Sequence, residues 1–135
     1  SDTVLTQIAA EALGIRYEDV RVISADTDLT PWDLGAYASR LTLMAGNAVK
    51  GAAESARAHV YAAASNLLGV PAEQLEGSLG VIRSRAEPSR SVTFAEAAHQ
   101  AFSRLGPIVG TGAYSPPKMG GTFKGAAVGE VMLRR

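Results

Sequence analysis

Hydrophobic side chains recur at helical spacing in three stretches of the chain. In residues 3–13, Val4, Ile8 and Ala12 fall on one helical face. The stretch from Ser39 to Leu68 is rich in alanine and contains no proline, so it predicts a helix of roughly 30 residues and about 45 Å. The third stretch, TFAEAAHQAFSRLG, opens with the Thr-x-x-Glu pattern of a capping box and predicts a short helix.

Alternation of apolar and polar side chains predicts extended structure elsewhere. The sequence DVRVISADTD, residues 19–28, alternates through Val20, Val22 and Ile23 and reads as a strand. Residues 75–94, LEGSLGVIRSRAEPSRSVTF, read as a hairpin with a Pro-Ser turn. Residues 106–135 are rich in glycine and proline, and we expect them to be loop-like and to cross another surface. Together these elements predict an α+β fold, with a long alanine-rich helix and shorter helices packed on a small sheet.

A weak repeat links two parts of the chain. The segments AEALGIRYEDVRV (10–22) and ASNLLGVPAEQLEG (64–77) share a helix end, Leu-Gly, a β-branched residue, and an acidic residue before an apolar one. Both read as helix, glycine stop, short turn and strand, with Asp2 and Gly14 bounding the first helix. The alternative interpretation is that both segments simply use the commonest way to end a helix.

Composition narrows the classes of function. With 135 residues, 47% of them hydrophobic, the chain is long enough for one folded domain. Lys plus Arg and Asp plus Glu both number 13, so no strong positive field favours nucleic acid as a partner. The sequence has no cysteine, no apolar run long enough to span a membrane, and no pattern of a signal peptide. We therefore expect a cytoplasmic chain without nucleic-acid or membrane partners.

Several polar groups resemble reactive sites only superficially. Asp26, Asp28 and Asp33 lack the spacing of a calcium-binding loop, and loop aspartates more often cap turns. His59 and His99 lie far apart in a chain without cysteine, which disfavours zinc. The sequence GGTFKGAAVG does not have the order of a phosphate-binding loop. We predict no metal ligand and no catalytic residue in this chain.

The start of the long helix is the strongest candidate for binding. It lies in DLGAYASRLTLMAGNAVKGAA (33–53), which carries no charge between Arg40 and Lys50. The free N–H groups and positive dipole end of a helix N-terminus favour an anion such as phosphate. Ala38 would let a ligand approach the backbone closely, Ser39 and Thr42 could add hydroxyl donors, and Arg40 could add charge. The alternative is that Ser39 only caps the helix.

Three segments of the sequence carry a family resemblance: SDTVLTQIAAEALGI, VRVISADTDLTPWDLGAYASRLTLMAGNAVKGAA and GPIVGTGAYSPPKMGGTFKGAAVG. They resemble the molybdopterin-binding large subunit of the xanthine dehydrogenase and aldehyde oxidase family. In style they are nearest to the large subunits of 4-hydroxybenzoyl-CoA reductase-like and carbon monoxide dehydrogenase-like enzymes. The resemblance implies a molybdenum hydroxylase that uses molybdopterin cytosine dinucleotide and passes electrons to iron–sulfur and flavin (FAD) subunits. It also implies that the ASRLT segment contacts the pterin cofactor, through Ala38, Ser39, Arg40, Leu41 and Thr42.

The sequence also departs from that family. The Gly-Gln-Gly cofactor motif and the catalytic glutamate of the family are absent from residues 1–135, and the sequence diverges after Gly129. We therefore expect residues 1–135 to be a partial molybdopterin-binding domain, an internal fragment or the product of a truncated gene, whose partner is the remainder of the molybdenum subunit. The competing hypothesis is a stand-alone, catalytically inactive α+β interaction or assembly module derived from the family. The resemblance also implies that the substrate funnel is built largely from segments of the subunit outside residues 1–135.

Overall fold

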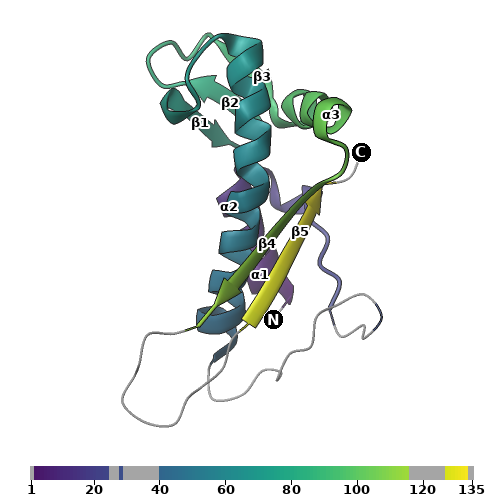
Figure 1. Ribbon diagram of the computed structural model, residues 1–135. Helices are drawn as coiled ribbons and strands as arrows, with labels where there is room; N and C mark the ends of the chain where they lie inside the picture. Colours follow the sequence, from purple (N-terminus) through teal and green to yellow (C-terminus); the bar gives the residue numbers. More distant parts are fainter. Residues whose placement is uncertain (1, 25–27, 29–39, 116–126, 134–135) are drawn as a thin grey trace.

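The computed structural model describes residues 2–24, 28, 40–115 and 127–133 (Figure 1). In this part of the chain the helices are α1 (Asp2–Leu13), α2 (Arg40–Leu68) and α3 (Phe94–Leu105), with 3₁₀ turns η1 (Tyr17–Asp19) and η2 (Ala72–Gln74). The strands are β1 (Leu75–Ser78), β2 (Val81–Ser84), β3 (Ser91–Thr93), β4 (Ile108–Tyr114) and β5 (Ala127–Leu133). They form two antiparallel sheets, in the orders β1-β2-β3 and β4-β5.

Helix α2 is the axis of the molecule. Its 29 residues make it about 43 Å long, and α1, α3 and the β4–β5 sheet all pack on it (Figure 1). Ala48, Ala52 and Ala56, spaced four residues apart, are completely buried along one stripe of the helix. The predicted long helix and the α+β class are confirmed, although the structure has two small sheets where the sequence predicted one.

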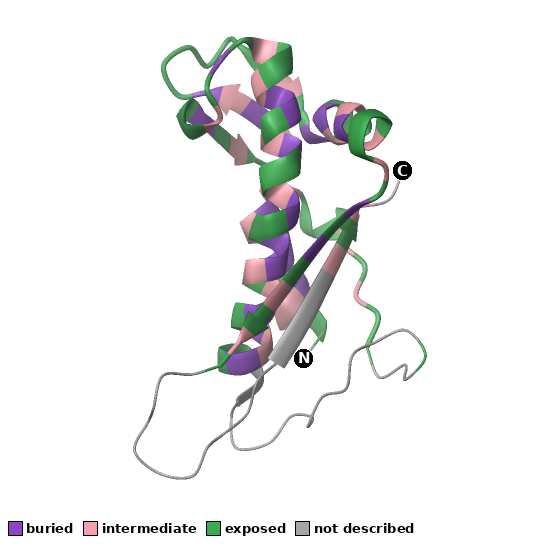
Figure 2. Ribbon diagram, viewed as in Figure 1, coloured by how far each residue is buried: buried purple, intermediate pink, exposed green. Residues whose placement is uncertain are grey.

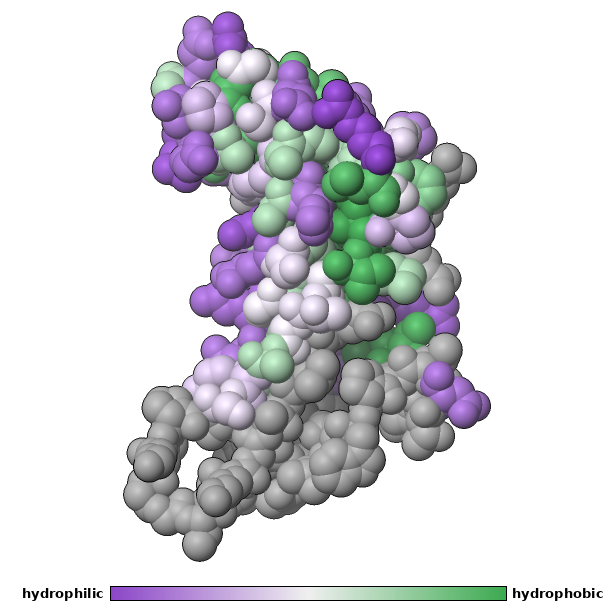
Figure 3. Space-filling view, in the orientation of Figure 1, coloured by the Kyte–Doolittle hydropathy of each residue, from purple (hydrophilic) through white to green (hydrophobic). Residues whose placement is uncertain are grey.

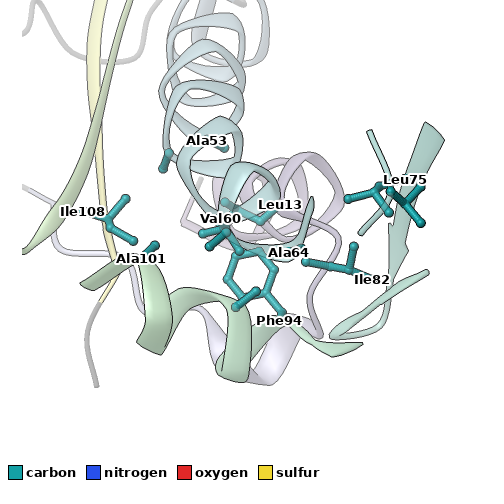
Figure 4. Close-up of a cluster of buried hydrophobic side chains, with 13 residues drawn as sticks. Leu13, Ala53, Val60, Ala64, Leu75, Ile82, Phe94, Ala101 and Ile108 are labelled. Atoms are coloured by element: carbon teal, nitrogen blue, oxygen red, sulfur yellow. The ribbon is translucent and has the colours of Figure 1, made fainter. Parts of the chain in front are cut away.

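The main hydrophobic core lies around the C-terminal half of α2. Val60 of α2 and Ile82 of β2 are the largest completely buried side chains, and Phe94 of α3 and Leu13 of α1 lie beside Val60 (Figure 4). Figure 2 shows buried residues following one side of α2 over most of its length. The core therefore joins both sheets and the three helices through one continuous face of α2.

The two predicted short helices have the expected boundaries. At the start of α3 the Thr93 hydroxyl accepts from the Glu96 amide at 3.1 Å, while the Glu96 carboxylate accepts from the Thr93 amide at 3.0 Å. This is the capping box that the sequence predicted. At the end of α1, Gly14 has a φ of +75° and donates to the carbonyl of Ala10 at 2.9 Å, so it ends the helix as expected.

The loop-like interpretation of residues 106–135 is wrong for their described parts, because these contain the paired strands β4 and β5. Two glycines explain the difference. A Cβ at Gly110 would overlap the carbonyl oxygen of Ala52 and lie 2.6 Å from the backbone nitrogen of Ala56, and a Cβ at Gly112 would overlap Ala48 and Ala52. Glycine is needed at these positions because the strand lies directly on the backbone of α2. In the sequence alone, the same glycines are indistinguishable from those of a loop.

The strand predicted within residues 19–28 is also wrong for the described residues of that range. Asp19 ends the 3₁₀ turn η1, and Val20 to Ser24 form no ladder with any described strand. Burial still alternates, since Val20 and Val22 are half-buried whereas Arg21 and Ile23 are exposed. The side-chain pattern of a strand is present, but the structure contains no paired neighbour among the described residues.

Part of the outer face of the β4–β5 sheet is exposed at the end where β4 begins and β5 ends. Val109 and Met132 are cross-strand neighbours and remain 39% and 51% exposed, and hydrophobic surface gathers over this end of the two strands (Figure 3). Among the described residues, no helix combines the length and the hydropathy needed to cross a membrane.

Candidate cofactor-binding site

The predicted binding residues lie at the N-terminal end of α2, as far as the structure describes them. Arg40 and Leu41 are the first two residues of the helix, and Thr42 follows in the first turn with an exposed side chain. Ala38 and Ser39 lie outside the described residues. The structure therefore confirms the position of the helix start for three of the five residues and brings those three into one turn.

The electrostatics of this turn suit a negative ligand. The first four N–H groups of an α-helix have no partner within the helix, and the aligned peptide dipoles place about half a positive charge at this end. The first turn of α2 contains no acidic residue, so no carboxylate of that turn competes for these donors. The Thr42 hydroxyl adds a donor that can rotate toward a ligand.

The strands β4 and β5 approach the helix start from the side. Tyr114, the last residue of β4, packs against the buried pair Met44 and Ala48 in the first third of α2. Figure 1 shows that β4 ends and β5 begins at the same end of the molecule at which α2 starts. On the α1 side, Gly46 leaves room for Ile8, whose Cδ1 would lie 2.9 Å from a Cβ at that position. The helix start is thus held between α1 and the β4–β5 sheet.

Sequence reasoning missed the residues that create this arrangement. Gly110 and Gly112 lie two positions apart in β4. Both face the stripe of Ala48, Ala52 and Ala56 on α2. A small residue at every second strand position, matched to alanine at every fourth helix position, is the signal that indicates such close packing. Local composition alone makes these glycines look like turn residues, because the periodic match is visible only when β4 and α2 are compared.

The described residues carry little reactive chemistry. They contain no group of three or more His, Asp or Glu side chains placed to hold a metal ion. The Tyr61 hydroxyl has its pKa raised because burial disfavours the phenolate, although the guanidinium of Arg57, 5.4 Å from the ring, acts in the opposite direction. Tyr61 lies 21 residues along α2 from Arg40, about 30 Å from the helix start. Among the described residues, the first turn of α2 therefore offers helix amides and the Thr42 hydroxyl as hydrogen-bond donors, and it contains no His, Asp or Glu side chain.

Comparison with known proteins shows the family to which the chain belongs. The molybdopterin cofactor-binding domain family matches residues 1–133. A probable hypoxanthine oxidase of Escherichia coli K12, XdhD, is 38% identical over 98% of this chain. The carbon monoxide dehydrogenase large chain of Afipia carboxidovorans is 32% identical over 87% of this chain.

Solved structures agree with these sequence relationships. The copper- and molybdenum-containing carbon monoxide dehydrogenase superposes with a TM-score of 0.67 at 29% identity over 96% of this chain. Quinoline 2-oxidoreductase from Pseudomonas putida 86 gives 0.66 at 29% identity over 94%. This chain spans about 15% of the length of each of these relatives. It therefore belongs to the molybdopterin cofactor-binding domain family and corresponds to part of a xanthine dehydrogenase-family molybdenum subunit.

Proposed function

We propose that this chain forms one wall of the cofactor site in a molybdenum hydroxylase, with residues 38–42 contacting the pterin cofactor. Family membership supplies the cofactor class, and the start of α2 supplies a position where its anionic part can be bound. The observation that carries the proposal is a first helical turn without acidic residues and with Thr42 exposed. Ala38 and Ser39 are included in the proposal because of the sequence alone.

The donors present fit a phosphorylated cofactor. Free amides of the first turn and the Thr42 hydroxyl are donors, and phosphate oxygens are strong acceptors. We propose molybdopterin cytosine dinucleotide as the form bound, because its pyrophosphate would match a helix N-terminus. When bound, the cofactor supplies the redox chemistry of molybdenum. The residues of this chain would bind and orient it, and we propose that the catalytic base comes from another part of the molybdenum subunit.

The same proposal implies partners. The chain would act within a longer molybdenum subunit in the cytoplasm, next to iron–sulfur and flavin subunits or domains that carry electrons away. The exposed pair Val109 and Met132 supports this arrangement, because an apolar sheet face favours burial against further protein.

The test is a double substitution, Ser39→Ala with Thr42→Ala, in a full-length subunit that contains residues 1–135. Each lost hydroxyl should cost about 0.5–1.5 kcal/mol of binding free energy, and more if it contacts a charged phosphate. We expect lower molybdopterin content after purification. Thermal unfolding of the apo-protein should change little, because the loss of one helix cap costs at most about 2 kcal/mol.

Two further variants sharpen the test. Thr42→Ser keeps the hydroxyl and should retain the cofactor, whereas Ala38→Leu should lower cofactor content more than the double substitution, since bulk there would hold the ligand off the backbone. A double variant with full molybdopterin content and a much lower melting temperature would show that Ser39 is only a helix cap. In that case the assignment of residues 38–42 to the cofactor is wrong.

A further inference from the structure

The weak sequence repeat is a close structural repeat. Positions 55 residues apart correspond: α1 ends before Gly14 and α2 ends before Gly69, with φ of +75° and +65°. Each helix is followed by a 3₁₀ turn at the same distance, η1 at Tyr17–Asp19 and η2 at Ala72–Gln74. The repeat therefore covers both helix ends and the turns that follow them.

Hydrogen bonds repeat with the same offset. The Ile15 amide donates to the Ala10 carbonyl at 3.1 Å, as the Val70 amide donates to Ser65 at 3.3 Å. In the turns, the Asp19 amide donates to Arg16 at 3.1 Å, as the Gln74 amide donates to Pro71 at 2.9 Å. The next residues, Val20 and Leu75, have φ and ψ of −106° and 130°, and of −93° and 147°. In both segments the residue after the turn thus has a similar, extended backbone conformation.

After the 3₁₀ turns, the two repeated segments differ in whether a neighbouring strand pairs with them. Leu75 begins β1, which pairs with β2 over four residues. The equivalent residues 20–23 show the same alternation, with the first and third side chains more buried than the second and fourth. Among the described residues, the backbone groups of residues 21–24 have no hydrogen-bonded partner. Val20 therefore has the backbone conformation of Leu75, and residues 20–23 have the alternation in burial of β1 without its pairing.

This segment is held in place at both ends. The Arg16 guanidinium makes two hydrogen bonds to the Asp19 carboxylate, at 2.9 and 3.0 Å, which fixes the turn before it. After it, the Ser24 hydroxyl donates to the Asp2 carboxylate at the start of α1, at 3.1 Å. Ile23 between these contacts is 50% exposed. A positioned, extended segment with an open backbone edge and an exposed apolar side chain is a template for strand addition.

We infer that residues 20–24 are a docking edge, and that their occupant is an extended strand from the remainder of the molybdenum subunit. This inference rests on the proposal that the chain acts within a longer subunit. The relatives are several times longer than this chain, which spans about 15% of their length, so most of such a subunit is available to supply the strand. The partner is recognised by main-chain hydrogen bonds, together with an apolar side chain that covers Ile23.

The repeat also predicts which amides pair. In β1, the Gln74 carbonyl accepts from the Arg85 amide at 2.9 Å. Hydrogen-bonded pairs alternate along an antiparallel ladder, so Glu76 and Ser78 direct their amides toward β2 in the observed register. The equivalent residues are Arg21 and Ile23. Their amides should donate to the incoming strand, whereas those of Val22 and Ser24 should face the other edge.

Amide exchange, resolved by residue, tests this in the 135-residue chain and in the full-length subunit that contains it. In the chain alone we expect residues 21–24 to exchange freely. In the full-length subunit, the amides of Arg21 and Ile23 should exchange at least tenfold more slowly, with Val22 and Ser24 much less changed. Glu76 and Ser78 provide the internal control, because they are paired in both samples.

Proline substitutions give an independent readout. Ile23→Pro removes an amide that should pair, and Val22→Pro removes its neighbour on the opposite edge. We expect Ile23→Pro to lower the melting temperature of the full-length subunit more than Val22→Pro, although Val22 is the more buried side chain. Free exchange at all four amides in the full-length subunit overturns the inference, as does protection already present in the 135-residue chain. Molybdopterin content is measured on the same samples, so failure of this inference is distinct from failure of the proposed cofactor site.

Discussion

Replacing Gly112 with alanine should separate β4 from α2. The added Cβ would overlap the carbonyl oxygen of Ala48 and the amide nitrogen of Ala52, and would lie 2.9 Å from the carbonyl carbon of Gly51. These are backbone atoms inside a helix, so they cannot rotate away as a side chain would. The strand must move outward by about 1 Å, and its neighbours on the inner sheet face lose part of their dispersion contacts. We expect a loss of about 3 kcal/mol or more, at the upper end of the range for overpacking.

Gly51→Ala is the matched control, because Gly51 faces Gly112 across the same contact. A Cβ at Gly51 would lie 3.7 Å from the Cα of Gly112, an ordinary van der Waals distance. Alanine also favours the helix by about 1 kcal/mol over glycine, so this variant should be as stable as the parent chain or more stable.

Thermal unfolding followed by circular dichroism measures both variants. For a chain of this size, each kcal/mol shifts the melting temperature by roughly 3–5 °C. Gly112→Ala should therefore melt at least about 10 °C below the parent, and Gly51→Ala at or above it. Equal stability of Gly112→Ala and Gly51→Ala would refute the direct packing of β4 on the backbone of α2.

Two other changes test features of the core and its borders. Thr93→Ala removes the hydroxyl of the capping box and should lower the free energy of unfolding by about 1 kcal/mol. Thr93→Ser keeps the hydroxyl and should retain most of the stability of the parent chain. Equal losses in the two variants would mean that the capping hydrogen bond contributes nothing. Burial raises the pKa of Tyr61, so above about pH 10 the folded state holds this proton more tightly than the unfolded chain does. The contribution of Tyr61 is therefore fully present below about pH 10 and is lost as the pH rises through the folded-state pKa. Denaturant midpoints at pH 8 and pH 11 should show this decline in the parent chain and a smaller one in Tyr61→Phe; identical declines in the two chains would contradict it.

Local signals in the sequence predicted the helices well. Each has a periodic apolar face, and glycine or a capping box marks a boundary, as at Gly14 and Thr93. These signals act within a few residues, so they are readable without knowledge of the tertiary structure. The start of α2 was predicted for the same reason, and with it the position of Arg40, Leu41 and Thr42.

The errors came from residues whose role depends on distant neighbours. Gly110 and Gly112 indicate a loop when only local composition is considered, and a strand only when Ala48, Ala52 and Ala56 are known to face them. Val20 and Val22 have the alternation of a strand, but a ladder also needs a second strand, which a local pattern cannot supply. Secondary structure set by long-range packing is therefore where the sequence interpretation failed.

The contact between β4 and α2 also determines how accurately the helix start can be positioned. Most helix–sheet contacts are made by long side chains, whose rotamers can readjust and so allow the two elements to slide by fractions of an ångström. Here the contacting groups are glycine Cα atoms, alanine methyls and main-chain atoms, none of which has a χ angle that could take up such a shift. The backbone of β4 up to Tyr114 is therefore held against the first third of α2 by direct contact between main-chain atoms. A ligand bound at that turn would therefore meet backbone whose position relative to β4 is already set.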